Sequence, residues 1–310
     1  MEYRRLGSSG LKVSVLGLGG NTFGVSADLA QTARIVHHAI ELGVNFVDTA
    51  DTYTRGVSEE YVGAALKGRR GDMMIATKVY GEMGPGPNDR GLSRQHILNG
   101  VEASLRRLGT DYIDLYQVHF WDAETPLDET LRTLDDLVRD GKVRYLGCSN
   151  YTGWQTVWAL WVADRRGYAP FVSNQPQYSL LERDVERELI PACLAHGIGL
   201  IPYSPLAGGL LTGKYREGEP PPRGTRAENN ERMRRRFTPR AFGLVRRLSE
   251  WAEARGHTVG ELAIAWLAAQ PVVSTIIAGA RHPEQVEANL RATEWLLTAD
   301  ELSEIDELCA

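Results

Sequence analysis

Val-Asn-Phe-Val-Asp-Thr-Ala-Asp-Thr-Tyr, residues 44–53, opens as a short apolar run that ends on an aspartate and has a tyrosine close behind. Two more apolar runs end on an ionisable residue, Met-Met-Ile-Ala-Thr-Lys at 73–78 and Ile-Asp-Leu-Tyr-Gln-Val-His at 113–119. Short buried runs of this kind are typical of parallel strands, whose C-terminal ends meet at one edge of a sheet. We therefore expect four side chains to lie together: Asp48, Tyr53, Lys78 and His119.

Similar strand-like runs alternate with helix-like segments along the chain, which is the pattern of successive βα units. The predicted strands centre on Val15, Phe46, Ile75, Leu115, Leu146, Val172, Leu200 and Thr275. Most of them recur at intervals of roughly 30 residues, the length of one strand, one helix and two loops. Eight such units predict an α/β fold, a (β/α)8 TIM barrel, and its rival is an open doubly wound sheet. We favour one barrel domain over residues 1–310, because the units use nearly the whole chain and no linker interrupts them.

Two stretches depart from this pattern. Residues 3–13 predict an N-terminal β-hairpin that turns around Ser8-Ser9-Gly10 and covers the bottom of the barrel. Residues 213–240 are rich in proline, glycine and arginine and form a long loop after strand 7. So long a loop is either a disordered excursion or a functional lid.

The bulk composition restricts the class of protein. A net charge of -5 argues against a general nucleic-acid binder. The arginines 232, 234, 235 and 236 occur together with Glu228 and Glu231, so this cluster predicts a solvated charged face. The sequence shows neither a signal peptide nor an apolar run of membrane-spanning length. The 3 cysteines have no metal-ligand spacing and suit a reducing compartment, so we expect a cytoplasmic protein without a metal site or membrane contact.

The four ionisable residues at the predicted strand ends suggest proton-transfer chemistry. We expect the lysine to stay charged beside the aspartate and to lower the pKa of the tyrosine, which can then protonate a carbonyl oxygen. The histidine can hold that oxygen in place. Any one of them alone is most simply a satisfied polar group at the barrel rim, but four together favour an enzyme.

Two glycine-rich segments are candidates for binding a nucleotide. Residues 17–22 follow a strand, but Thr22 stands where a dinucleotide fingerprint needs its third glycine. Residues 208–215 nearly match a P-loop, but Tyr215 replaces the hydroxyl residue that binds magnesium. A glycine-rich loop with a lysine can still bind a pyrophosphate through its amides and its charge.

With these motifs the chain resembles the aldo-keto reductase family along essentially its full length. The segment 45–53 resembles the Asp-x4-Tyr segment of that family. The other matching motifs follow in the family's order: Thr77-Lys78, Gln117-Val118-His119, Gly147-Cys148-Ser149-Asn150, Asn174-Gln175, Tyr203-Ser204-Pro205-Leu206 and Gly279-Ala280-Arg281.

The resemblance implies a role for each matching residue. It makes Asp48, Tyr53, Lys78 and His119 a catalytic tetrad with Tyr53 as general acid or base, and it makes NADP(H) the cofactor. Substrate contact is expected from Tyr53, His119 and Trp121. From the residues alone, Trp121, Phe23 and Trp154 are candidates for an apolar wall, and packing at the barrel rim is the alternative for the tryptophans. The implied cofactor-binding residues are Asp48, Ser149, Asn150, Gln175, Tyr203, Ser204, Pro205, Leu206, Gly208, Lys214, Arg226, Gly279, Arg281, Gln285 and Asn289.

Within that set, the resemblance places Tyr203 against the nicotinamide ring and Arg281 at the 2′-phosphate, which favours NADP(H) over NAD(H). Taken without the resemblance, Ser149 and Asn150 are equally well explained as a cap of the fifth helix.

The function implied by the resemblance is NADPH-dependent reduction of an aldehyde or ketone to an alcohol, with a small carbonyl compound as the partner. A C=C reductase is disfavoured, because that branch carries a carboxylic acid at the position of His119. A nucleotide-sensing regulatory subunit is the non-enzymatic rival. It is disfavoured by His119 and by the lack of a separate N-terminal segment for a partner. The sequence predicts neither the substrate nor the oligomeric state.

Overall fold

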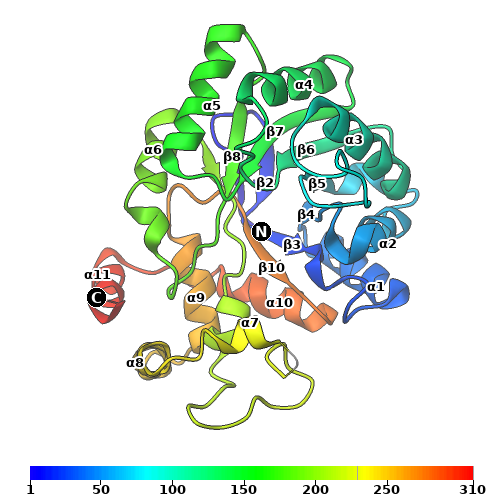
Figure 1. Ribbon diagram of the computed structural model, residues 1–310. Helices are drawn as coiled ribbons and strands as arrows, with labels where there is room; N and C mark the ends of the chain where they lie inside the picture. The colour runs from blue at the N-terminus through cyan, green and yellow to red at the C-terminus, as the bar shows by residue number, and fades with distance from the viewer. Residues whose placement is uncertain (229, 310) are drawn as a thin grey trace.

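The computed structural model describes residues 1–228 and 230–309, and its centre is an eight-stranded parallel sheet (Figure 1). The strands are β3 (Leu16–Gly19), β4 (Phe46–Asp48), β5 (Met74–Val79), β6 (Ile113–Val118), β7 (Val143–Ser149), β8 (Phe171–Gln175), β9 (Gly199–Leu200) and β10 (Ile276–Gly279). Their order is β10-β3-β4-β5-β6-β7-β8-β9. Each predicted strand centre lies in one of these strands or directly before it.

The sheet closes on itself into a barrel. Beyond β9, Leu200 pairs in parallel with Val273, and Tyr203 pairs in parallel with Ile277. The Ile277 amide also donates to the Pro202 carbonyl at 2.9 Å. These contacts join the last strand in the order to the first, so the predicted (β/α)8 barrel is confirmed and the open doubly wound sheet is wrong.

Helices surround the barrel on its outside (Figure 1). They are α1 (Leu29–Glu41), α2 (Val57–Ala65), α3 (Arg94–Leu108), α4 (Leu127–Arg139), α5 (Gly153–Arg166), α6 (Leu189–His196), α7 (Glu231–Arg234), α8 (Pro239–Glu253), α9 (Val259–Ala268), α10 (Pro283–Ala292) and α11 (Ala299–Cys309). Several begin at a polar cap: the Ser93 side chain accepts from the His96 amide at the start of α3. None in the described part of the chain is long and apolar enough to cross a bilayer.

The N-terminal hairpin closes the bottom of the barrel, as predicted. Strands β1 (Tyr3–Arg5) and β2 (Lys12–Ser14) pair antiparallel. Leu6 and Val13 are fully buried in the cluster of side chains that fills the barrel interior. Gly7 has a φ of +58° and lies so close to the backbone of β8 and β9 that a Cβ there would clash. The open end is therefore the opposite one, where the strands end.

The long segment after β9 returns to the barrel and extends past α7 (Figure 1). The Gly224 carbonyl accepts a hydrogen bond of 2.7 Å from the Arg281 guanidinium. Met233 of α7 is 5% exposed. Of the two readings of this segment, these contacts favour a lid over a disordered excursion.

Candidate active site

Four ionisable side chains meet at the C-terminal ends of neighbouring strands. Asp48 is the last residue of β4, Lys78 lies near the end of β5, and His119 directly follows β6. Tyr53 is carried by the turn after β4. The Lys78 Nζ lies 2.5 Å from Asp48 Oδ2, 2.9 Å from the Thr49 carbonyl and 3.3 Å from the Tyr53 hydroxyl. One buried ammonium thus joins the carboxylate to the phenol.

Two buried amides fix the orientation of the carboxylate. Asp48 Oδ1 accepts from Gln117 Nε2 at 3.1 Å and from Gln175 Nε2 at 2.8 Å. The other oxygen accepts from Lys78. Both oxygens of Asp48 therefore have buried donors, and the side chain forms an ion pair with Lys78.

The pKa values of Lys78 and Tyr53 follow from this geometry. Burial opposes the charge on Lys78, but Asp48 and then Tyr53 raise its pKa above the ordinary value, so the side chain is an ammonium ion. Burial raises the pKa of Tyr53, and the Lys78 charge offsets only part of that rise. The predicted net lowering of the tyrosine pKa is therefore wrong, because burial outweighs the lysine. The phenol is protonated and can act as an acid.

His119 is a neutral imidazole. Burial and the nearby charge of Lys78 lower its pKa to about 3. Its ring centroid lies 6.0 Å from that of Tyr53, edge to face, and its ring stacks on Phe120 at 4.8 Å. A neutral imidazole beside a phenol can donate one hydrogen bond to an oxygen without competing for its proton.

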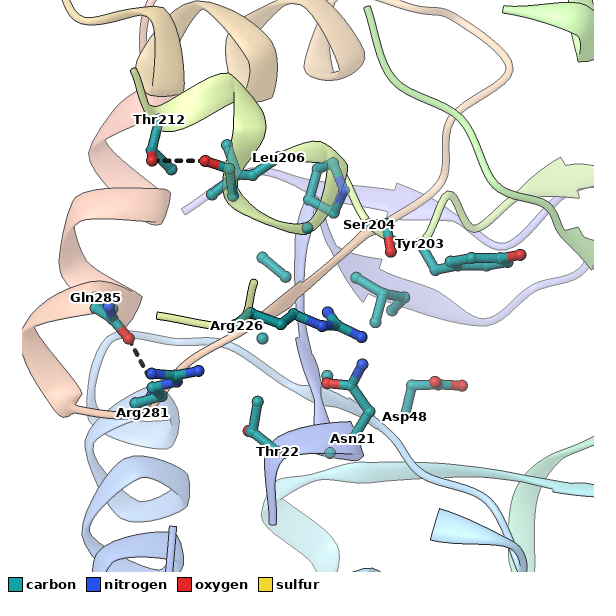
Figure 2. A pocket seen from close by; sticks show the side chains of 18 of the residues that line it. Asn21, Thr22, Asp48, Tyr203, Ser204, Leu206, Thr212, Arg226, Arg281 and Gln285 are labelled. Atoms are coloured by element: carbon teal, nitrogen blue, oxygen red, sulfur yellow. Dashed lines mark hydrogen bonds between the residues drawn. The ribbon is translucent and has the colours of Figure 1, made fainter. Parts of the chain in front are cut away.

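A cavity of about 230 Å³ extends from this cluster across the ends of β3, β9 and β10. In Figure 2, Arg281 and Gln285 lie at one end, Asp48 and Tyr203 at the other, and Arg226 between them. The predicted cofactor residues that line it are Asp48, Tyr203, Ser204, Pro205, Leu206, Gly208, Lys214, Arg226, Gly279, Arg281 and Gln285.

A second cavity of about 320 Å³ adjoins the first on the His119 side. The residues that line both cavities are Asn21, Tyr53, Tyr203, Ser204, Gly208 and Arg226. The second cavity adds three more of the predicted cofactor residues, Ser149, Asn150 and Gln175. Because the Tyr53 phenol faces both cavities, the arrangement suits a reaction between two molecules, one bound in each cavity.

Some predicted residues lie outside both cavities. Asn289 lines a separate, much smaller space behind β3. Trp121 packs against Tyr151, Trp154 and Trp158 with ring centroids 5.1–5.6 Å apart. Phe23 is fully buried. The structure thus places these residues away from the lining, and their binding roles stay predictions.

The site also concentrates backbone strain. Among the described residues, the non-glycine residues with positive φ are Thr54, Arg55, Asn150, Ser204 and Ala207. They follow β4, β7 and β9 at the open end of the barrel, where such strain accompanies binding and catalysis.

The residue that caps α5 is Thr152, and neither Ser149 nor Asn150 does so. The capping interpretation of Ser149 and Asn150 is therefore wrong. Asn150 instead donates to the His119 carbonyl at 3.0 Å and accepts from the Tyr203 hydroxyl at 2.9 Å.

Sequence reasoning missed several lining residues. Asn21 and Thr22 line the first cavity directly after β3, and the rule applied to the other strand ends would have found them. Gln177, Asn230 and Arg236 line the second cavity. These three residues lie in loops, and no hydrophobic periodicity in the sequence indicates that these loops contact the barrel.

Asp51, just behind the tetrad, is a buried carboxyl with an unusual environment. It is 1% exposed, and neither oxygen has a hydrogen-bond partner of good geometry among the described residues. Burial and then the charge of Glu59 raise its pKa to about 7. Since the unfolded chain loses this proton near pH 4, folding stability falls as the pH rises from about 4 to about 7 and then levels off.

We expect Asp51→Asn to remove this pH dependence. The parent should lose about 1.4 kcal/mol of unfolding free energy per pH unit in this range, and the variant should not. The difference in unfolding free energy, variant minus parent, should therefore rise by about 3 kcal/mol between pH 5 and pH 8. Denaturant unfolding at several pH values measures it. Asp111→Asn, at an exposed aspartate, is the control. Parallel stability curves for parent and Asp51→Asn would refute the assigned environment.

Comparison with known proteins matches the whole barrel. The model of the aldo/keto reductase family matches residues 15–310. The chain is 40% identical over 317 residues to a probable voltage-gated potassium channel subunit beta of Arabidopsis thaliana, covering 99% of this chain and 96% of that protein. It is 36% identical over 338 residues to versiconal hemiacetal acetate reductase of Aspergillus parasiticus, covering 99% and 96%. It is 34% identical over 321 residues to L-glyceraldehyde 3-phosphate reductase of Escherichia coli K12, covering 99% and 92%.

Proposed function

Because this chain belongs to the aldo/keto reductase family, an oxidoreductase family that acts on carbonyl groups, we propose that it reduces an aldehyde or ketone to an alcohol with NADPH. The observation that carries the proposal is the Lys78 ammonium, which bridges the Asp48 carboxylate and the Tyr53 hydroxyl beside a neutral His119. Nothing about this arrangement requires a metal ion.

The first cavity fits a dinucleotide with several phosphate groups. Lys214, Arg226 and Arg281 line it, and the acidic residue among its lining, Asp48, is already paired with Lys78. Burial and the charge of Arg281 lower the pKa of Lys214, as expected where cations gather without an anion. These cations would bind the phosphates, with Arg281 at the 2′-phosphate.

The junction of the two cavities fits a nicotinamide. Tyr203 offers a ring to stack on, and Ser149, Asn150 and Gln175 offer hydroxyl and amide groups for a carboxamide. NADPH bound in this way would supply a hydride to the carbonyl carbon.

The residues of the chain would complete the reduction at the oxygen. His119 donates a hydrogen bond to the carbonyl oxygen and orients it. Tyr53 transfers its hydroxyl proton to the same oxygen, and the Lys78 charge stabilises the phenolate that remains. Solvent then returns a proton to Tyr53. In the reverse direction the phenolate takes the proton of the alcohol.

A regulatory nucleotide sensor is the second candidate, favoured by the 40% identity to the Arabidopsis protein named as a channel subunit. The assay that separates the two follows NADPH absorbance with aromatic aldehydes, methylglyoxal, sugars and ketones. We expect steady NADPH oxidation with at least one carbonyl compound. Tight NADPH binding without turnover across the panel would support the sensor instead.

The cofactor preference is tested with Arg281→Ala. Loss of a charge-assisted contact worth about 1.5–3 kcal/mol should weaken NADPH binding by about 10- to 100-fold and NADH binding much less. The affinities are measured by fluorescence titration. Arg291→Ala, at an exposed arginine of α10, the helix that follows Arg281, is the matched control. Equal losses for both nucleotides would rule out the 2′-phosphate role.

A further inference from the structure

One arginine of the charged run after β9 leaves the surface and enters the second cavity. Arg235 fits the predicted solvated face, since it is exposed and forms an ion pair of 3.6 Å with Glu231. Arg236 does not, because it is half-buried and lines the cavity that contains His119. The side chain of Arg232 lies outside the described residues.

The lid segment holds Arg236 in this position. Asn230 caps the short helix α7 by accepting from the Met233 amide at 3.0 Å. Met233 is buried and packs so closely on Gly208 that a Cβ at Gly208 would clash with it. The Arg236 amide then donates to the Met233 carbonyl at 3.1 Å. Docking of α7 on Gly208, in the loop after β9, therefore fixes the backbone from which Arg236 extends.

The second cavity carries positive charge without a counter-ion. Its cations are Arg226 and Arg236, and no aspartate or glutamate of the described chain lines it. Burial and then the charges of Arg236 and Arg281 lower the pKa of Arg226. Arg236 also borders a neighbouring cavity lined by Glu182 and Asp184, but neither forms an ion pair with it. Two like charges in one cavity favour the entry of an anion.

The two arginines are placed for different anions. Arg226 lines both cavities, so it can serve a phosphate of the cofactor together with Lys214 and Arg281. Arg236 lines the second cavity and not the first, so it is available to bind an anionic group of the substrate.

Gln177 supports Arg236 and adds a donor. Arg236 Nη2 donates to Gln177 Oε1 at 3.1 Å, which orients the guanidinium. The Gln177 Nε2 is buried and has no acceptor within the described structure. A carboxylate or phosphate oxygen would supply that acceptor and take further N–H donors from Arg236.

We propose that the substrate is a small aldehyde or ketone that bears an anionic group, a carboxylate or a phosphate, bound by Arg236 and Gln177. The proposal rests on the carbonyl reduction proposed above. The cavity of about 320 Å³ must also admit the nicotinamide ring, which restricts the substrate to a small molecule.

The test compares matched substrates with and without the charge. The pairs are 4-oxobutanoate with butanal, for a carboxylate, and glyceraldehyde 3-phosphate with glyceraldehyde, for a phosphate. We expect the parent protein to reduce at least one anionic member with a kcat/KM about 10-fold or more above its neutral partner. The variant Arg236→Ala should lower that ratio by about 10- to 100-fold, mainly through KM, and Arg236→Lys should restore part of it. Arg234→Ala, at an exposed arginine of α7, should keep the parent ratio.

Each outcome bears on the proposal. Equal rates for charged and neutral partners, or an unchanged ratio in Arg236→Ala, would overturn it while leaving carbonyl reduction intact. If no carbonyl compound were reduced, the proposed function would fail, and calorimetry would test the anion site alone. There, 4-hydroxybutanoate should bind the NADPH-loaded protein more tightly than 1-butanol does, and Arg236→Ala should abolish the difference. Equal binding of the two would overturn the anion site as well.

Discussion

Replacing Tyr53 by phenylalanine is expected to lower kcat for carbonyl reduction by about a thousand-fold, the scale of a lost general acid. The variant loses only the hydroxyl that lies 3.3 Å from Lys78 Nζ. Its ring still fills the same space against His119. NADPH affinity should therefore stay within about two-fold of the parent, since the phosphate-binding cations are untouched. Single-turnover absorbance measurements give the rate, and fluorescence titration gives the affinity.

The matched control is Tyr61→Phe on α2, at a half-buried tyrosine that lines neither cavity. It should keep the parent rate. A Tyr53→Phe protein that retained more than a tenth of the parent rate would contradict the assignment of Tyr53 as the acid. An equal loss of NADPH binding and turnover would instead indicate a structural defect.

The tetrad could be located from the sequence because its members follow a local rule. Asp48, Lys78 and His119 each end an apolar run, and parallel strands must bring such ends together. The barrel could be predicted because each strand and each helix has a hydrophobic pattern that is visible in a short stretch of consecutive residues. What the runs do not encode is the strength of burial around a side chain. For this reason the predicted lowering of the Tyr53 pKa is wrong, although the prediction that Lys78 lies beside Tyr53 is confirmed.

The residues that escaped prediction depend on contacts between distant parts of the chain. Arg236 belongs to an arginine-rich run whose composition predicts solvent exposure. It enters the cavity because Met233 docks on Gly208, a contact fixed by shape and not by periodicity. Asp51 likewise gives no signal in sequence, since its raised pKa arises from burial beside Glu59. Substrate selectivity is therefore the part of the function that sequence alone predicts least.

Lys78→Met is expected to damage both stability and turnover, and the two effects can be separated. The substitution leaves the Asp48 carboxylate buried without its cation, which costs on the order of 3–5 kcal/mol of unfolding free energy. It also removes the charge that stabilises the Tyr53 phenolate, so kcat should fall by about 100- to 1,000-fold.

The double variant Asp48→Asn with Lys78→Met distinguishes a catalytic lysine from a merely structural one. Removing both charges should recover most of the lost unfolding free energy, because no unpaired ion remains in the barrel. The rate should not recover, since the Tyr53 phenolate still lacks a cation within 3.3 Å. Denaturant unfolding and kcat measured on the parent, both single variants and the double variant complete the cycle. Recovery of turnover together with stability would show that Lys78 only neutralises Asp48. Recovery of stability alone would place the lysine in the proton transfer itself.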